Sequence, residues 1–212
     1  MINLKERLNS VFNEIESGER VADIGCDHGK LSCKLLQEGL AEKVIAVDIS
    51  AESLEKTKVL KEKLNLSNLE TRVGDGLTVI GKNEVDTIVI AGMGGMEIIK
   101  ILSESKNIFS KYVFVPHTND KELRLYLMDK FEIKKDYLIK ENNKFYNVIV
   151  CTPGKSNLSE EEIEFGKNKN NPILVELLNK RLNEYTSYLL KAEDKTELIK
   201  KIELIKRVLK NV

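Results

Sequence analysis

The sequence has no apolar run long enough to cross a bilayer, which takes about 20 consecutive apolar residues. Residues 1–20 mix charged and apolar side chains and contain no apolar block, so they do not resemble a secretory signal peptide. These two absences argue against an exported or membrane-bound protein. We therefore predict a cytoplasmic protein without membrane contact.

Cysteine and net charge are also scarce. The cysteines Cys26, Cys33 and Cys151 are odd in number and lack metal-type spacing, so the sequence predicts free thiols, without a disulfide framework or a metal site. In a reducing compartment they are best interpreted as small buried hydrophobes. With 34 basic and 34 acidic residues, the formal net charge is zero. Overall charge thus gives no sign of a nucleic-acid partner, and any basic surface must be local.

The chain does contain an alternation of strand and helix patterns. Its 212 residues suffice for one α/β domain and a smaller appendage, and the 42% hydrophobic and 32% charged residues are typical of a soluble protein. The run at 85–90 is nearly all apolar, as in strands buried on both faces of a parallel sheet. We predict strands at 20–25, 43–48, 69–73, 85–90, 112–115, 131–140 and 144–151, and helices at 4–15, 30–38, 50–65, 95–103 and 120–130.

This order of elements predicts the fold class. Strand–helix alternation indicates parallel pairing through right-handed crossovers. Asn142-Asn143 lies between the last two strands, which indicates a hairpin and an antiparallel edge. We expect an α/β, Rossmann-like domain with a mixed seven-stranded sheet over residues 1–152. Residues 153–212 carry leucines at helical spacing and no strand signal, which predicts a C-terminal domain of two antiparallel helices packed as a small coiled coil.

The first candidate binding motif is Val21-Ala-Asp-Ile-Gly-Cys-Asp-His-Gly29, at the sheet edge where open α/β folds bind ligands. Its glycines, including Gly25, let a ligand approach the backbone. A dinucleotide needs G-x-G-x-x-G, but the middle glycine is absent and Asp23 and Asp27 would repel a pyrophosphate. A ligand with a sulfonium and an ammonium group fits, which favours S-adenosylmethionine (SAM) over NAD. We assign His28 to shaping this site. The alternative is a tight turn in which Asp27 caps the following helix.

Two further loops supply candidate cofactor contacts. Asp48 ends the second strand about 20 residues after the glycines, where an acid can accept both hydroxyls of a ribose. Its neighbour Ile49 is included among the cofactor-binding candidates. Asp75-Gly76 follows the third strand, and in this architecture Asp75 could bind the exocyclic amine of an adenine. The alternatives are a solvated strand end for Asp48 and a simple Asp-Gly turn for Asp75.

The loops after the fourth and fifth strands point to the substrate. Ala91-Gly92-Met93-Gly94-Gly95 brings the backbone against a ligand and leaves room for a flat substrate, unless it is merely a flexible turn. Its first four residues are cofactor-binding candidates. Amino-directed DNA methyltransferases carry an Asn-Pro-Pro-Tyr type segment here, and this chain does not. The segment 115–120 could close one wall of the substrate site, with His117 as a catalytic base or as a hydrogen-bonded surface histidine.

The predicted last helix is rich in basic residues, which allow two interpretations. They could form an electrostatic footprint for RNA phosphates. They could equally belong to a solvated helix face. The residues concerned are Lys200, Lys201, Lys206, Arg207 and Lys210.

Three strings together resemble one known family. Ala22-Asp-Ile-Gly-Cys-Asp-His-Gly29, Gly74-Asp-Gly-Leu77 and Ile90-Ala-Gly-Met-Gly-Gly95 are similar to motifs of the bacterial tRNA (adenine-22-N1)-methyltransferases, which are class I SAM-dependent enzymes. The resemblance covers residues 1–152. The helical tail matches in type, because the family carries a C-terminal coiled-coil domain.

Two positions depart from the family pattern. The family usually has Gly-Glu at the end of the second strand, where this chain has Val47-Asp48 with the same chemistry. It usually reads Gln-Pro-Asn after the fifth strand, where this chain reads Val115-Pro116-His117. The second difference changes the expected wall of the substrate site.

The resemblance implies SAM as methyl donor and ring nitrogen N1 of an adenine in the tRNA D-arm, at position 22, as acceptor. That nitrogen lies on the Watson–Crick edge, so the base must be unpaired or flipped out. Catalysis is then mostly positioning, with stabilisation of positive charge growing on the purine. Asp27 is the predicted catalytic residue, because its carboxylate could hold the exocyclic amine and accept a proton. A monomer without a metal is expected.

Two other functions are compatible with the motifs. The chain could methylate another RNA site or a small molecule with SAM, although a small substrate would need no helical tail. It could also be a non-catalytic RNA-binding protein with a relic SAM fold. Intact Asp23, Gly25, Asp48 and the turn at 92–95 argue against such decay. SAM binding tests the relic hypothesis, and a tRNA-shift assay tests the small-molecule one.

Overall fold

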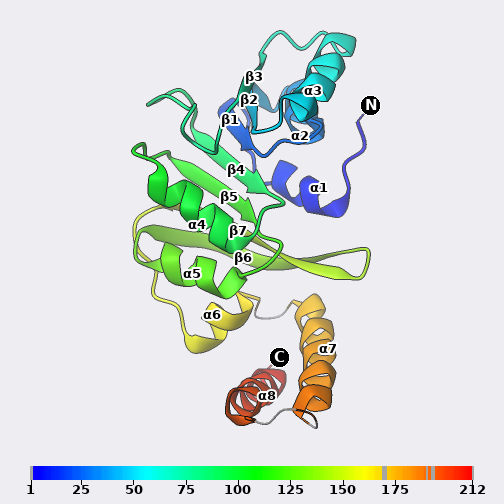
Figure 1. The fold of residues 1–212 in the computed structure, drawn as a ribbon, viewed down its shortest axis with the longest axis vertical. Helices are drawn as coiled ribbons and strands as arrows, with labels where there is room; N and C mark the ends of the chain where they lie inside the picture. Colours follow the sequence, from blue (N-terminus) through cyan, green and yellow to red (C-terminus); the bar gives the residue numbers. More distant parts are fainter. Residues whose placement is uncertain (1, 169–170, 190, 192–193, 212) are drawn as a thin grey trace.

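Seven strands form one mixed sheet with helices on both faces (Figure 1). The strand order is β3-β2-β1-β4-β5-β7-β6, in which β1 to β5 are parallel and β7 is antiparallel to both of its neighbours. The structure, a computed structural model, describes residues 2–168, 171–189, 191 and 194–211. The strands are β1 (Glu19–Ile24), β2 (Ala41–Asp48), β3 (Leu69–Val73), β4 (Thr87–Ala91), β5 (Lys111–Val115), β6 (Phe131–Glu141) and β7 (Lys144–Pro153). The predicted Rossmann-like sheet with an antiparallel edge hairpin is confirmed.

Two apolar cores lie on opposite faces of this sheet because strand side chains alternate between the faces. Ala22 and Ile24 of β1 pack with α4 and α5 on one face, whereas Val21 packs with α1 and α2 on the other. Within the described ranges, no helix is both long and apolar enough to cross a membrane. The helices that cover the sheet are α1 (Glu6–Phe12), α2 (Lys30–Gln37), α3 (Ala51–Lys63), α4 (Gly95–Glu104) and α5 (Asp120–Met128).

Local signals explain where two of these elements begin and turn. Ser50 caps α3, since its hydroxyl accepts a hydrogen bond from the Ser53 amide at 3.2 Å. Asn142 and Asn143 join β6 to β7 with φ angles of 48° and 62°. Asparagine tolerates this left-handed region better than most residues, which suits a two-residue hairpin loop.

One irregularity in β6 sets which of its side chains face which core. Lys134 has no pairing partner in β7 and forms a β-bulge. Ile133, before the bulge, packs in the core beneath α4 and α5. Asp136 and Leu138, after it, lie on the same face, where Asp136 meets α5 and Leu138 packs with the C-terminal helices. Regular alternation would have put Ile133 and Asp136 on opposite faces.

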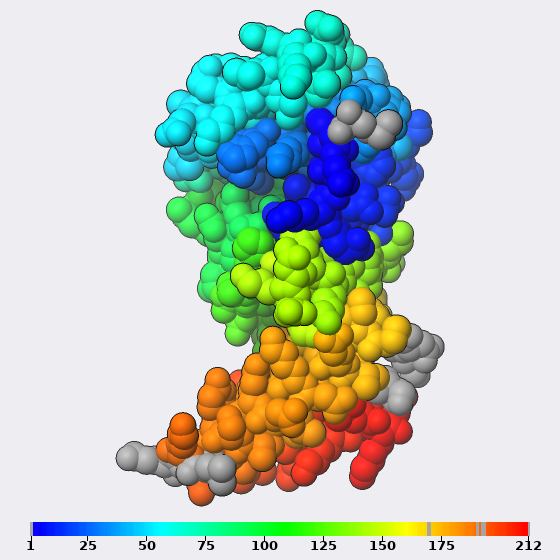
Figure 2. Space-filling model, turned by 90° about the vertical axis from the view of Figure 1, so that its right-hand side faces the viewer, coloured from blue at the N-terminus to red at the C-terminus, as the bar shows by residue number. Residues whose placement is uncertain are grey.

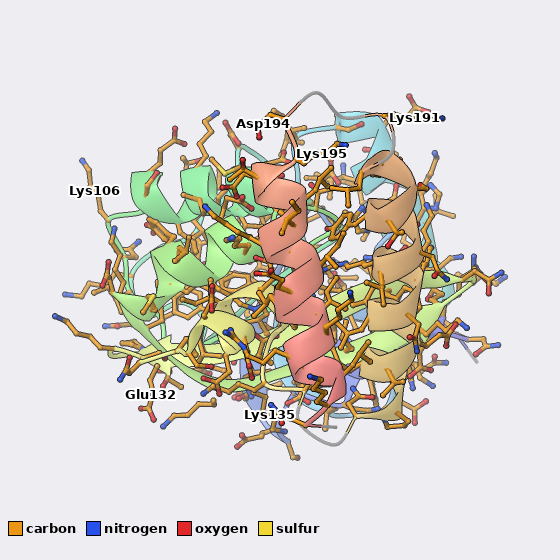
Figure 3. The ribbon with its side chains drawn as sticks, turned by 90° about the horizontal axis from the view of Figure 1, so that it is seen from below. Lys106, Glu132, Lys135, Lys191, Asp194 and Lys195 are labelled. Atoms are coloured by element: carbon orange, nitrogen blue, oxygen red, sulfur yellow. The ribbon has the colours of Figure 1, made fainter. Side chains whose placement is uncertain are left out.

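The chain ends in three helices, α6 (Glu160–Phe165), α7 (Pro172–Leu189) and α8 (Thr196–Leu209). Seen from below, α7 and α8 lie side by side, with Lys191 and Lys195 near the end where the chain turns back (Figure 3). Buried leucines of α7 pack with Ile205 and Val208 of α8. The two predicted antiparallel helices are therefore present, and their packing as a coiled coil stays a prediction. The short helix α6 was not predicted.

A buried polar network ties this tail to the sheet. The Arg124 guanidinium on α5 meets the Asp136 carboxylate on β6 at 2.6 and 3.1 Å, with both side chains fully buried. Arg124 also donates to the carbonyl of Ile163 in α6 at 3.3 Å. Gly166 follows with φ of 78°, and a Cβ there would lie 2.6 Å from Asp136 Oδ1. A glycine is thus needed for the chain to pass this ion pair.

Candidate functional site

The carboxyl ends of the parallel strands meet at one edge of the sheet, and a cavity of ≈ 270 Å³ opens there. It lies between α1 and the loop after β1. Figure 2 shows this face of the molecule, with the N-terminal segment and α1 lying between α3 and the tip of the β6–β7 hairpin. Larger cavities beside β3 and between α6 and α8 contain none of the motif residues. The predicted site residues in the lining are Asp23, Gly25, Asp27, His28 and Ala91.

Asp23 presents a buried carboxylate to this cavity. Its side chain lies at the end of β1, and it accepts a hydrogen bond from the Ser32 hydroxyl at 2.6 Å. Burial raises the pKa of Asp23 to about 6, although Ser32 and the charge of Arg7 act in the opposite direction. A carboxylate held in this way attracts a ligand that brings its own positive charge.

Arg7 is a functional candidate that sequence reasoning missed. It lines the cavity from α1, and its Nη1 atom is buried without a hydrogen-bond partner among the described residues. A Cβ at Gly92 would lie 3.1 Å from this nitrogen, so the guanidinium reaches the small-residue turn after β4. The Arg7 amide is held by the Glu141 carboxylate at 2.9 Å, at the hairpin tip. An unpaired buried guanidinium nitrogen is unfavourable, and an anionic ligand group would satisfy it.

Asp48 and Ile49 lie at the same edge, outside the cavity lining. The Asp48 carboxylate accepts hydrogen bonds from the amides of Asp27 at 3.0 Å and Ser50 at 2.9 Å. Asp48 is therefore a fixed group that orders the loop after β1, rather than a freely solvated strand end. Ile49 is 73% exposed, which leaves a large apolar side chain open to a ligand.

The loops after β1, β4 and β5 hold each other in place. Gly25 has φ of 72°, and a Cβ there would overlap the Met93 methyl group. Gly92, with φ of 116°, donates its amide to the Val115 carbonyl at 3.1 Å. The His117 amide donates to the Met93 carbonyl at 2.9 Å. The turn after β4 is thus a fixed wall of the site rather than an untethered one.

Asp27 carries an exposed carboxylate at the same edge. Its backbone has φ of 50°, its side chain is 72% exposed, and Oδ1 lies 3.5 Å from His28 Nε2. The alternative that Asp27 caps α2 is wrong, because Gly29 takes the cap position without a side-chain hydrogen bond. The Asp27 carboxylate is consequently free to reach a group that binds above the cavity.

The remaining candidates are set further along the edge. Asp75 is exposed, and its carbonyl accepts hydrogen bonds from the Thr78 amide and hydroxyl. Gly76 has φ of 57°, and a Cβ there would lie 2.9 Å from the side chain of Ile101 on α4. This glycine therefore packs against α4, and only its backbone is available to a ligand. Gly94 is the N-cap residue of α4. These positions do not line the cavity.

His117 is placed beside an aromatic residue that the sequence did not single out. Its ring centroid lies 5.5 Å from that of Tyr146 on β7, at an interplanar angle of 52°. Burial lowers the pKa of His117, and the charges of Arg7 and Lys144 lower it further. The imidazole is therefore neutral at pH 7. The His117 side chain is exposed, and no side-chain hydrogen bond to it is found within the described part of the chain, so it is a surface histidine that no protein group fixes.

Of the cysteines, half-buried Cys26 lines the cavity, whereas Cys33 and Cys151 are buried in the two apolar cores. All three are free thiols, as predicted, and burial raises the pKa of Cys33 to about 11. Within the described residues, no group of three or more His, Cys, Asp or Glu side chains could hold a metal ion.

The glycine loop after β1, the fixed acid ending β2 and the small-residue turn after β4 lie on a seven-stranded sheet with one antiparallel strand. This combination defines a class I methyltransferase. A family model described as a methyltransferase domain matches residues 4–149. The chain belongs to this family of methyltransferases, and it is 30% identical to a putative tRNA methyltransferase of Mycoplasma pneumoniae over 199 residues, which span 88% of this chain and 92% of that protein.

Individual relatives support this membership. The tRNA (adenine(22)-N(1))-methyltransferase of Bacillus subtilis is 34% identical over 158 residues, which span 72% of this chain and 66% of that enzyme, just under two thirds of its length. The crystal structure of the B. subtilis m1A22 tRNA methyltransferase TrmK superposes with a TM-score of 0.85 at 26% identity, covering 98% of this chain and 99% of that one. M. capricolum TrmK, solved with S-adenosyl-homocysteine, gives a TM-score of 0.89 at 28% identity and covers 99% of both chains.

Proposed function

We propose that this protein transfers a methyl group from SAM to ring nitrogen N1 of adenine 22 in the D-arm of tRNA. One observation carries the cofactor assignment. The cavity under α1 combines the buried carboxylate of Asp23 with the buried, unpaired guanidinium nitrogen of Arg7. An amino acid end, with its ammonium and carboxylate, is the complement of this pair.

The rest of the edge suits the other parts of SAM. The fixed Asp48 carboxylate would accept the ribose hydroxyls, and the exposed Ile49 side chain would cover one face of the adenine. The Asp75 carboxylate would accept a hydrogen bond from the exocyclic amine of the SAM adenine. When bound, SAM supplies an activated methyl group on a positively charged sulfur. The nearby carboxylates are compatible with that charge.

The chain's own residues then orient the acceptor and stabilise charge. The tethered turn at 92–95 leaves space for a flat base beside the cavity. Its N1 lies on the Watson–Crick edge, so the adenine must enter flipped out of the tRNA stack. Methylation leaves positive charge on the purine, and the Asp27 carboxylate would stabilise that charge and accept a proton from the exocyclic nitrogen.

The function is tested by incubating the purified protein with labelled SAM and unmodified bacterial tRNA, then digesting the product to nucleosides. We expect labelled N1-methyladenosine, and its loss when A22 of the tRNA is replaced. Label in another nucleoside would show a different acceptor. Measurable SAM binding without any transfer to tRNA would contradict the proposed substrate.

Asp27→Ala is expected to lower the rate of methyl transfer about 100-fold and to leave SAM affinity within about two-fold of wild type. An effect of this size is typical of losing one positioned acid–base group. Single-turnover methylation and SAM titration measure the two quantities separately. Asp129→Ala removes an exposed aspartate at the end of α5 and is the control. Turnover close to wild type in Asp27→Ala would refute the assignment.

Arg7→Met is expected to weaken SAM binding by 10- to 100-fold, because a buried charge-assisted hydrogen bond contributes about 1.5 to 3 kcal/mol. Decarboxylated SAM provides the matched ligand. If Arg7 holds the carboxylate, wild type should bind the decarboxylated ligand more weakly than SAM, and Arg7→Met should bind the two equally. A variant that still discriminates between the ligands would show that another group holds the carboxylate.

We also propose the division into domains 1–152 and 153–212, with the tail as the part that adds RNA contact area. Its basic residues on α8 favour this, although Arg207 is engaged by Glu160 at 2.6 Å and Glu161 at 3.0 Å. A monomeric state and a cytoplasmic location stay predictions.

A further inference from the structure

The acceptor base must use the half of the sheet edge that the cofactor leaves free. The cofactor candidates belong to the loops after β1, β2, β3 and β4. The remaining neighbour along the edge is the end of β5, followed in the sheet by β7. Ligands of open α/β folds lie along this edge, so the base is expected beside β5 and β7.

An aromatic pair occupies that position. β5 and β7 pair in the register Tyr112 to Cys151 and Phe114 to Ile149, and continuing this register puts His117 opposite Tyr146. The two rings are 5.5 Å apart, close enough to act as one surface. Tyr146 packs partly on the core that α1 also covers, which places it on the Arg7 side of the sheet.

The surroundings of this pair favour stacking of an aromatic ligand over proton transfer by His117. The imidazole of His117 is kept neutral by burial and by the nearby charges of Arg7 and Lys144. Neither the Tyr146 hydroxyl nor the His117 ring nitrogens have a hydrogen-bond partner among the described residues. Two adjacent rings that no side-chain hydrogen bond holds within the described residues can present their faces to another flat ring.

A cation stands next to the rings on the same strand. Lys144 begins β7 and is exposed, and it lies two residues from Tyr146, so both project from the same face of the strand. The other lysines on this hairpin are paired with carboxylates, as Lys135 is with Glu14 and Lys140 with Glu176. Within the residues described, Lys144 has no carboxylate within 4.0 Å.

We propose that Tyr146, with His117 beside it, is the surface on which the acceptor adenine stacks, and that Lys144 contacts a phosphate of the same RNA strand. An aromatic ring next to a cation is the combination that proteins use to hold single, unstacked nucleotides. This inference rests on the proposed function, since it assumes that an RNA base is the acceptor.

The stacking role is tested with Tyr146→Leu, which keeps apolar bulk and removes the ring, and with Tyr146→Phe, which keeps the ring. For Tyr146→Leu we expect kcat/KM for tRNA to fall 10- to 100-fold, with SAM affinity and thermal midpoint close to wild type. Tyr146→Phe should stay within about two-fold of wild type. Tyr126→Leu is the matched control, because Tyr126 is also partly buried but packs on the opposite core. With 2-aminopurine at position 22, the complex with Tyr146→Leu should be brighter than that with wild type.

The phosphate role is tested by salt dependence. Lys144→Gln should reduce the slope of log kcat/KM against log salt by about 0.7 to 0.9, the value for one phosphate contact. Lys106→Gln, in an exposed segment before β5 and so at the opposite end of that strand, should leave the slope unchanged (Figure 3).

The outcomes separate this inference from the proposed function. If wild type forms N1-methyladenosine and Tyr146→Leu does so equally fast, only the stacking role is overturned. If kcat/KM for tRNA falls as much in Tyr146→Phe as in Tyr146→Leu, the Tyr146 hydroxyl rather than its ring is responsible, and the stacking role is again overturned. An unchanged slope in Lys144→Gln overturns the phosphate contact. If wild type itself leaves tRNA unmethylated, the proposed function fails and the inference falls with it.

Discussion

Asp23→Asn is expected to stabilise the ligand-free protein and, at the same time, to lower its affinity for SAM about 100-fold. The free protein holds the Asp23 carboxylate in a buried site, where the Ser32 hydroxyl donates a hydrogen bond to it. Asparagine fills the same volume and can still accept that hydrogen bond. It carries no charge to desolvate, and it offers none to the ammonium group of the ligand.

The size and pH range of the stability gain follow from the pKa of Asp23. A pKa raised from the ordinary 3.8 to about 6 corresponds to about 3 kcal/mol of penalty once the carboxylate is ionised. Because the folded-state pKa is the higher one, the penalty is absent below about pH 4 and fully present above pH 6. The gain from Asp23→Asn should therefore be largest at pH 8 and vanish toward pH 4.

Urea unfolding between pH 4 and pH 8 measures this gain, and titration with SAM measures the affinity. Asp86→Asn is the control of opposite sign. Asp86 is paired with Arg20, which lowers the pKa of that carboxyl, so its replacement should destabilise the protein at neutral pH. Wild-type SAM affinity should also fall as the pH drops below 6. If Asp23→Asn bound SAM as tightly as wild type does, Asp23 would not be the ammonium site.

Arg124→Ala is expected to destabilise the protein by about 3 to 5 kcal/mol, the usual cost of breaking a fully buried ion pair. The variant would leave the Asp136 carboxylate buried without its partner and would free the Ile163 carbonyl. The double variant Arg124→Met with Asp136→Leu removes both charges and should recover most of the loss. If it were as unstable as Arg124→Ala, shape rather than unpaired charge would be the cause.

Urea denaturation followed by circular dichroism measures these differences in unfolding free energy. Arg207→Ala is the control, because Arg207 also forms two ion pairs across the tail but on an exposed surface. Exposed pairs contribute little, so its midpoint should match wild type. Since Arg124 joins the sheet to α6, Arg124→Ala should also expose the tail to protease before the rest of the chain.

Sequence patterns predicted the parts of the molecule that depend on interactions between residues close together in the chain. Apolar runs identified β1, β2, β4 and β5, and the serine before α3 and the two asparagines at the hairpin tip marked real boundaries. The glycine and acid motifs were also readable, because the ends of parallel strands necessarily meet at one edge. The helix α6 could have been read too, since Ser159 and Glu162 form a capping box.

The missed site residues depend on contacts between distant segments. Arg7 lies on an ordinary amphipathic helix, and only the docking of α1 brings its guanidinium to Gly92. Tyr146 faces His117 because of the register between β5 and β7, which no local pattern encodes. Gly76 shows the reverse case. It belongs to a motif that suggested ligand contact, but its open side is filled by Ile101 of α4.

Because of the bulge at Lys134, the length of the hairpin limits which insertions and deletions the sequence can accept. A one-residue deletion in β6 would invert every side chain from there to the tip, turning Asp136 away from Arg124 and Tyr137 away from its contact with Glu14. Insertions and deletions should therefore be tolerated only at Asn142-Asn143 or in compensating pairs. The position of the bulge in β6 should therefore vary far less between related sequences than the type of residue that occupies it.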